Sequence, residues 1–236
     1  MPNPTIDAEL LALVTATRPA SVADVVDLQG RIDAILPVDD GLKWFNLVYM
    51  AVTRNVRGEG VWKDINWIDT LDVIFAQLYF DAVANYLRGN RVAKSWAVLF
   101  DARDRTDVDR ILFALAGMNA HINHDLALAL IQTSTATHIP LDASSPEHDD
   151  YETVNTVLAA LIPQVLNDLA AGILGELAQD TGKVGQALAM WNVRAARDLA
   201  WDFAVHLSGL GGLQREAALL TQDQLTGVIG RMLLEL

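Results

Sequence analysis

Residues 111–131 read ILFALAGMNAHINHDLALALI, and this stretch decides how the chain folds. Both of its ends are apolar, as in a helix that lies inside a core. Its middle carries five polar or ionisable side chains: Asn119, His121, Asn123, His124 and Asp125. An unpartnered buried polar group costs about 1–3 kcal/mol. These side chains therefore need partners, which another helix, ordered water, a metal ion or a substrate can supply.

The composition fits a protein with a large buried core. Of its 236 residues 52% are hydrophobic, and the mean hydropathy is +0.23. No apolar run reaches the roughly 18 residues that a membrane helix needs. The first residues also lack the basic and apolar regions of a secretory signal. We therefore expect a cytoplasmic protein that has no membrane partner.

Charge and cysteine content exclude several classes of function. Because the chain has no cysteine, it forms neither disulfides nor thiolate sites, and any metal ion must be held by His, Asp, Glu or Asn. The net charge of −13 argues against nucleic acid and anionic membranes as partners. The sequence also lacks a glycine-rich phosphate loop, a GxSxG elbow and an HExxH motif, which disfavours nucleotide-dependent enzymes and serine hydrolases.

Apolar residues recur at helical spacing along almost the whole chain, and no segment alternates as a strand does. Ser21 is in position to cap the second helix, and Pro37 ends it. No linker or internal repeat divides the chain, so we predict one all-α domain over residues 1–236, a bundle of roughly eight to nine helices. The expected helices cover residues 6–16, 22–36, 41–57, 67–88, 94–102, 106–135, 150–178, 183–208 and 213–235.

The central polar residues fall on two sides of their helix. His121 and Asp125 are one turn apart, and His124 lies in the same arc, as a candidate general base. An imidazole and a carboxylate at this spacing can bind one divalent metal ion, and can equally form a hydrogen bond in which the carboxylate orients the imidazole. Asn119 and Asn123 lie on nearly the opposite side and are candidates for substrate binding. A purely structural hydrogen-bond network is an open alternative.

Asp72 is a second polar anomaly. In the helix expected over residues 67–88 it shares a face with apolar residues such as Phe75, which predicts a buried carboxylate. A buried carboxylate either is paired or has a raised pKa. A salt bridge to an arginine, for instance Arg54 or Arg194, would give it a structural role. A raised pKa would make it a candidate catalytic base.

A ladder of charges follows in the helix expected over residues 183–208. Arg194, Asp198, Asp202 and His206 stand at four-residue spacing. On an exposed helix face such a ladder stabilises the helix by about 0.2–0.5 kcal/mol per pair. Asp202 and His206 repeat, in reversed order, the spacing of the central imidazole–carboxylate pair.

The tryptophans beside this ladder open a second interpretation. Trp191 and Trp201 make full exposure of the ladder less expected. If this helix faces the central one, Asp202 and His206 join the central pair as further metal ligands. The substrate would then be contacted by Trp191, Arg194 and Trp201.

The string GMNAHINHDL at residues 117–126 resembles the signature of an uncharacterised family, a helical domain of unknown function found in bacteria and some fungi. The segment LDVIFA at residues 71–76, and Asp150-Tyr151 followed by Asn155, resemble the same family. The resemblance spans about residues 40–210 and implies an all-α fold without an assigned activity. It also marks the positions of interest as Asp72, Asn119, His121, Asn123 and Asp125.

A weaker likeness exists to the helical zinc-dependent phospholipase C and P1 nuclease fold. There a helix with an HxxxD pattern, similar to His121 and Asp125, supplies zinc ligands. That pattern continues to a proline and a further histidine, whereas residues 126–131 of this chain read LALALI. The third ligand of that fold is therefore missing, and the likeness is an analogy only.

Two functions follow from these patterns, and each implies a small-molecule ligand while leaving the oligomeric state open. The first is a metal-assisted hydrolase or lyase in which a divalent Zn, Mn or Fe ion activates water. Its ligands would be His121, Asp125, Asp202 and His206, with Asp72 or His124 as the base. The second is a metal-free cavity protein that binds or cyclises an apolar small molecule, as six tryptophans and four tyrosines suggest.

Overall fold

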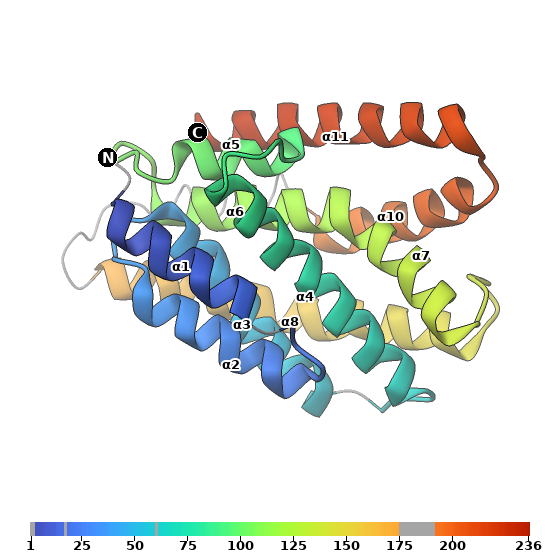
Figure 1. The fold of residues 1–236 in the computed structure, drawn as a ribbon. Helices are drawn as coiled ribbons and strands as arrows, with labels where there is room; N and C mark the ends of the chain where they lie inside the picture. Colours follow the sequence, from blue (N-terminus) through green and yellow to red (C-terminus); the bar gives the residue numbers. More distant parts are fainter. Residues whose placement is uncertain (1–2, 17, 60, 175–191) are drawn as a thin grey trace.

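The computed structural model describes residues 3–16, 18–59, 61–174 and 192–236. Within these ranges the chain is helical and contains no strand, which confirms the predicted all-α fold. Figure 1 shows α11 running along one side of the molecule above α5, with α1 and α2 on the opposite side. The helices are α1 (Pro4–Ala16), α2 (Val22–Ile35), α3 (Gly41–Glu59), α4 (Ile65–Leu87), α5 (Lys94–Ala102), α6 (Arg110–Ala120), η1 (His121–Asp125), α7 (Leu126–Thr137), α8 (Pro146–Leu174), α10 (Val193–Ser208) and α11 (Gly212–Leu234).

The α6–η1–α7 segment is the central element of the fold. It packs against α3, α4, α10 and α11. Every residue from Ile111 to Ala120 is buried, and a helix that is apolar on all sides belongs in the interior of a bundle. The buried apolar side chains form one cluster that reaches from Leu10 in α1 to Leu234 in α11. No helix in the described ranges is both long enough and apolar enough to cross a membrane.

The helix expected over residues 106–135 has different limits. It begins at Arg110, because Asp109 already has an extended backbone, and it is interrupted by the wider turn η1. It ends at Thr137, where His138 takes a left-handed conformation with φ of 60°. The sequence pattern therefore predicted the presence of this element, and the structure corrects its limits and its regularity.

Capping residues fix the ends of other helices. Ser21 accepts a hydrogen bond from the Asp24 N–H at 3.2 Å, as predicted. In α8, Ser145 accepts from the N–H of His148 at 3.1 Å and Pro146 takes the first helical position, so this helix begins four residues earlier than expected. In α10, Asn192 accepts from the Ala195 N–H, and the helix begins at Val193 rather than at residue 183. Residues 183–191 of the expected helix lie outside the described ranges.

Two glycines let α3 and α6 approach closely. A Cβ atom on Gly117 of α6 would lie 2.4 Å from the ring of Phe45. A Cβ atom on Gly41 of α3 would lie 2.5 Å from the ring of Phe113. Each aromatic ring therefore occupies the space that a side chain on the glycine would need. This contact fixes the position of α3 next to the polar turn that follows α6.

Candidate functional site

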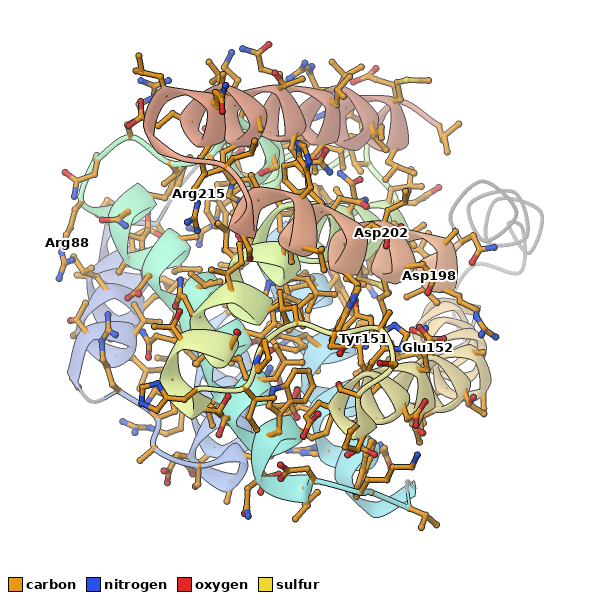
Figure 2. All side chains as sticks on the ribbon, turned by 90° about the vertical axis from the view of Figure 1, so that its right-hand side faces the viewer. Arg88, Tyr151, Glu152, Asp198, Asp202 and Arg215 are labelled. Atoms are coloured by element: carbon orange, nitrogen blue, oxygen red, sulfur yellow. The ribbon has the colours of Figure 1, made fainter. Side chains whose placement is uncertain are left out.

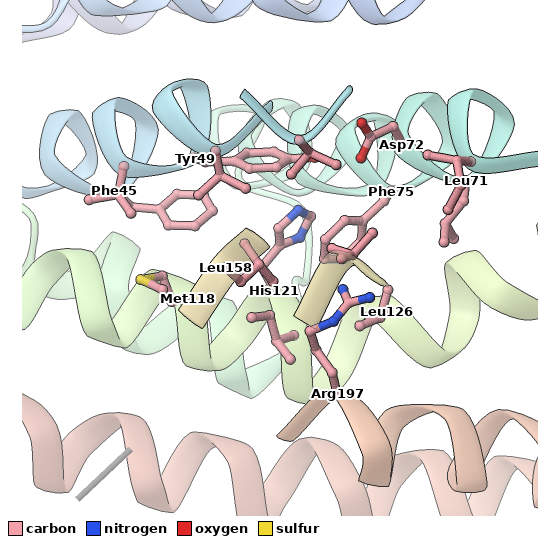
Figure 3. A pocket seen from close by; sticks show the side chains of 16 residues that line it. Phe45, Tyr49, Leu71, Asp72, Phe75, Met118, His121, Leu126, Leu158 and Arg197 are labelled. Carbon is pink, nitrogen blue, oxygen red and sulfur yellow. The ribbon is translucent and has the colours of Figure 1, made fainter. Parts of the chain in front are cut away.

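A small cavity lies next to η1, between α3, α4, α8, α10 and the α6–η1–α7 segment (Figure 3). Its volume is about 70 Å³, several times the roughly 10–15 Å³ that one water molecule needs. Three of its lining side chains are charged or titrate near neutral pH: Asp72, His121 and Arg197. The others are Phe45, Val48, Tyr49, Val52, Val56, Ile68, Leu71, Phe75, Met118, Ile122, Leu126, Val154 and Leu158. An apolar wall with a few convergent polar groups is typical of small-molecule sites.

The turn that carries His121 to the cavity is wider than an α-helical turn. In η1 the N–H of Leu126 donates to the carbonyl of His121, five residues earlier. Single π-turns of this kind inside α-helices are frequent at functional sites. A helical wheel drawn at a constant angle does not reveal such a turn, and the sequence accordingly predicted one regular helix here.

Asp125 is the centre of a buried hydrogen-bond network. Its Oδ2 accepts from His121 Nδ1 at 3.1 Å and from Trp96 Nε1 at 2.9 Å, and its Oδ1 accepts from His124 Nδ1 at 2.7 Å. Burial opposes the ionisation of Asp125, but the hydrogen bonds from the two histidines outweigh it and lower the pKa of the carboxyl group. Asp125 is therefore ionised and acts only as an acceptor.

The two histidines respond differently to this carboxylate. Burial lowers the pKa of His121 and outweighs the effect of Asp125. Burial acts in the same direction on His124, but there the hydrogen bond and the charge of Asp125 prevail and raise the pKa. His121 is therefore a neutral imidazole with its proton on Nδ1, whereas His124 pairs with Asp125 as an imidazolium at mildly acidic pH.

The imidazole of His121 is held between aromatic rings. Its ring is parallel to that of Phe75, with the centroids 3.5 Å apart, and the ring of Tyr49 meets it at 4.6 Å (Figure 3). Its Nε2 is buried and has no hydrogen-bond partner among the described residues. Because Nδ1 carries the proton, Nε2 presents a lone pair. The cavity wall therefore holds a hydrogen-bond acceptor in a fixed orientation.

Asp72 lines the same cavity from α4. Burial raises the pKa of its carboxyl group to about 7, and the nearby Asp69 adds to this effect against the opposing charge of Arg197. The expected salt bridge to Arg54 or Arg194 is not formed, because both arginines are exposed and Arg194 pairs with Glu152 at 3.2 Å. The raised pKa, the other outcome expected for Asp72, is the one that the structure supports.

Arg197 is a site residue that the sequence did not single out. It lies on α10 among Ala196, Ala200, Trp201 and other buried residues, and only 5% of it is exposed. The charge ladder that begins at Arg194 lies on the opposite, solvated face of the same helix. An arginine within a stripe of alanines and a tryptophan was the signal available, because such a stripe marks the buried face.

Asn119 and Asn123 do not line the cavity. Asn119 is fully buried and donates from Nδ2 to the carbonyl of Thr226 at 2.9 Å. Asn123 donates to Asn119 Oδ1 at 3.0 Å, and its own carbonyl accepts from Gln222 Nε2 at 2.9 Å. Both amides, which were expected to contact a substrate, therefore bind η1 and α6 to α11.

The remaining residues predicted to bind substrate lie apart from the cavity. Arg194 is exposed and pairs with Glu152. Trp201 is buried against Tyr151, with ring centroids 5.0 Å apart, and is not part of the cavity wall. His124, a predicted base, is turned toward Asp125 and does not line the cavity either. Trp191 lies outside the described residues.

The four predicted metal ligands do not meet at one point. Asp202 and His206 are exposed on α10, and Figure 2 shows Asp202 on the outer side of that helix. His121 and Asp125 are buried and bound to each other. In the part of the chain that the structure describes, no three His, Asp or Glu side chains are placed to hold a metal ion together.

The fold and the cavity together define a class: an all-helical protein in which an oriented, buried imidazole opens into an apolar cavity. The chain belongs to the family of unknown function DUF5995, which it matches over residues 22–236. This confirms the resemblance to an uncharacterised helical family. No curated protein and no solved structure matches the chain, so no structural match supports the likeness to the phospholipase C and P1 nuclease fold.

Proposed function

We propose that this protein binds a small, mainly apolar molecule in the cavity and directs a hydroxyl or N–H group of that molecule at His121 Nε2. One observation carries the proposal: this nitrogen is a buried acceptor with no partner among the described residues. Leaving such a group unsatisfied costs about 1–3 kcal/mol. A bound donor would recover that free energy.

The orientation of the imidazole supports a ligand rather than a structural role. Asp125 holds Nδ1, and the parallel ring of Phe75 holds the plane of the imidazole. The acceptor at Nε2 is therefore in place before any ligand arrives, and pre-organisation of this kind lowers the cost of binding. A cavity of about 70 Å³ suits a molecule, or the end of a molecule, with few non-hydrogen atoms.

The same geometry gives less support to a metal-assisted hydrolase or lyase. His121 and Asp125 use Nδ1 and Oδ2 on each other, and Asp202 and His206 are exposed on another helix. An ion at His121 would have Nε2 as its only ligand from this pair, in a wall that also carries the cation Arg197. A neutral hydrogen-bond donor is the better match for that position.

The proposal is tested with two isomers, butan-1-ol and methyl propyl ether. They have the same atoms, but only butan-1-ol has a hydrogen-bond donor. Each is titrated into protein labelled with ¹⁵N at histidine, and the Nε2 resonance of His121 and the melting temperature are followed. We expect butan-1-ol to shift the resonance and to raise the melting temperature more than the ether does. Equal responses to the two isomers, or none to either, would overturn the proposal.

Two variants complete the test. His121→Leu removes the acceptor and should abolish the preference for the alcohol over the ether. Leu158→Phe fills the cavity from α8 and leaves the Asp125 network intact, so it should lose binding while the fold is kept. Binding of butan-1-ol that survives the filled cavity would place the ligand elsewhere.

One observation favours a second function, general base catalysis on the bound molecule. A carboxylate that binds Nδ1–H of a histidine leaves Nε2 ready to accept a proton, and Asp125 and His121 are arranged in this way. The test is proton exchange of butan-2-one in D₂O, followed by NMR. Nε2 would take a proton from a carbon beside the carbonyl, and a deuteron would return to the enolate from the exchanged imidazolium. A rate equal to that of His121→Gln would rule this function out.

A further inference from the structure

Arg197 brings a positive charge to the cavity wall, and neutral groups hold it there. Its Nε donates to Asn155 Oδ1 at 2.6 Å, and its Nη2 donates to the carbonyl of Tyr151 at 3.1 Å. The guanidinium also lies over the ring of Tyr151, with its central carbon 4.1 Å from the ring centroid. These contacts fix the plane of the guanidinium without neutralising its charge.

The side chains that the structure describes offer Arg197 no direct ion pair, and the charge of Asp72 acts on it only across the cavity. By contrast, Arg103, the other strongly buried arginine, pairs with both Asp7 and Asp40. A buried cation is costly unless it is paired. Arginine is also well suited to bind a carboxylate through two parallel N–H groups. The comparison with Arg103 therefore marks Arg197 as a cation that lacks its anion.

We infer that the molecule bound in this cavity is an organic anion, a short apolar carboxylate that pairs with Arg197. This inference rests on the proposed binding function and names its ligand class. The hydroxyl or N–H group that binds His121 and the carboxylate that binds Arg197 would stand on one small carbon skeleton. A hydroxylated short-chain acid has both groups.

The charges around Asp72 determine how binding depends on pH. Asp69 lies on the same helix, and Tyr49 faces the cavity from α3 with a pKa raised by burial and by the charge of Asp72. Arg197 acts on Asp72 from α10. From η1 come His121, which is neutral, and the ionised Asp125 behind it.

An anion bound at Arg197 would weaken the stabilising effect of Arg197 on ionised Asp72. It would therefore raise the pKa of Asp72 further above its value of about 7 in the empty cavity. Binding above that pH then takes up a proton, and the affinity for the anion falls as the pH rises. This dependence separates a carboxylate at Arg197 from a neutral ligand.

The experiment compares butyrate with butan-1-ol by calorimetry on the full chain. We expect butyrate to bind at least about tenfold more tightly near pH 6, because a hydrogen bond to a charged partner adds to the burial of the same carbon chain. Titrations at about pH 8 in phosphate and in Tris should show a net uptake of protons when butyrate binds. The Asp72→Asn variant should bind butyrate without proton uptake.

Two variants on α10 assign the effect to Arg197. Arg197→Met should lose the preference for butyrate and still bind butan-1-ol. Arg194→Met is the matched control, because Arg194 is exposed three residues earlier and pairs with Glu152; it should bind both probes as the parent does. If Arg197→Met does not fold, Arg197→Lys, which keeps the charge, takes its place. It should bind butan-1-ol and retain part of the preference for butyrate, and complete loss of that preference would overturn the inference.

The outcomes separate this inference from the proposed function. Butan-1-ol that binds at least as well as butyrate would overturn the inference and leave the cavity function standing. Butyrate binding without proton uptake, or with an unchanged preference in Arg197→Met, would also overturn it. If neither probe binds, the proposed function fails as well.

Discussion

The polar side chains on the two sides of the central helical segment differ in whether they have hydrogen-bond partners. Toward α11, Asn119 and Asn123 bond to each other and Asn119 bonds to the Thr226 carbonyl, so that the buried amides are used within the protein. Toward α3 and α4, His121 keeps a bare nitrogen and Asp72 has a pKa of about 7. The first face is a joint between helices, and the second is a wall with spare hydrogen-bonding capacity.

Whether the buried polar groups are paired distinguishes a structural cluster from a functional one. A network in which every group has a partner stabilises the fold and leaves nothing for a ligand. Groups that stay unpaired at a cost to stability need another reason to be there. Substitutions should therefore lower stability where the partners are complete, and should spare or raise it where they are not.

The largest expected effect on stability is at Asp125, which holds the cavity residue His121 through its Nδ1. Asp125→Ala leaves His121, His124 and Trp96 without their shared acceptor. Removal of one member of a buried charge pair costs about 3–5 kcal/mol. We expect a loss of this size in the free energy of unfolding, measured by urea denaturation at mildly acidic pH, where His124 is charged.

The matched control is Asp107→Ala. Asp107 is also an ion-paired aspartate, bound to Arg105, but its side chain is 69% exposed. Surface changes of this kind stay within about 0.5 kcal/mol. If both variants lost the same stability, the Asp125 network would not be the buried support described above.

The next effect tests the joint with α11. Asn119→Ala removes the donor to the Thr226 carbonyl and the acceptor for Asn123. Groups left unsatisfied in the interior cost about 1–3 kcal/mol, and we expect this loss in urea denaturation. Binding of small probes in the cavity should be unaffected, because Asn119 does not line it.

Asn55→Ala serves as its control. Asn55 also donates from its side chain to a backbone carbonyl, that of Ala51, but on the exposed side of α3. Its loss should change the stability by less than about 0.5 kcal/mol. Weaker binding of small probes to Asn119→Ala would show that the two faces are energetically coupled rather than independent.

Much of this arrangement could be predicted from the sequence, since apolar spacing gave the helices and five polar residues in an apolar run marked the centre. The cavity could not, because it depends on which helices meet there. Residues 126, 154 and 197 come together only through the packing of α7, α8 and α10. The four-residue spacing correctly predicted that His121 and Asp125 lie next to each other. The same spacing is compatible with a metal site and with a hydrogen bond, so it could not decide between them.

The sequence also could not fix the faces of α10. Asp202 and His206 have the spacing of a ligand pair, but Ala196, Ala200 and Ala204 turn the other face of the helix inward. The ladder is thus solvated, and Arg197 reaches the cavity. Deciding between these faces needs the register of α10 against α7 and α8, a property of tertiary packing rather than of local sequence.

A smaller effect, of opposite sign, is expected at Asp72. The folded pKa of about 7 is above the ordinary value of about 4, so the folded state holds this proton more tightly than the unfolded state. Below about pH 4, Asp72 therefore does not change the free energy of unfolding. As the pH rises from there through about 7, the ionisation of Asp72 in the unfolded state lowers this free energy. Asp72→Asn should be more stable than the parent at about pH 8, with the gain vanishing on acidification.

Thermal melting across this pH range measures the effect, and Asp202→Asn is the control. Asp202 is exposed on α10, so its replacement should change the melting temperature only slightly. A parent protein that was more stable than Asp72→Asn at high pH would mean that the Asp72 carboxylate has a stabilising partner. The cavity wall would then resemble the joint with α11.

The smallest expected effect comes from a chelator. The carboxylate of η1 is already used within the protein, because Asp125 accepts from both imidazoles and from Trp96. A metal ion held by the native state would raise the melting temperature by mass action, and EDTA would lower it again. We expect the melting temperature to be the same with EDTA, without it and with added Zn²⁺. A fall of several degrees in EDTA that His121→Leu does not show would make His121 a metal ligand, and its bare Nε2 would then be the place of the ion rather than of an organic donor.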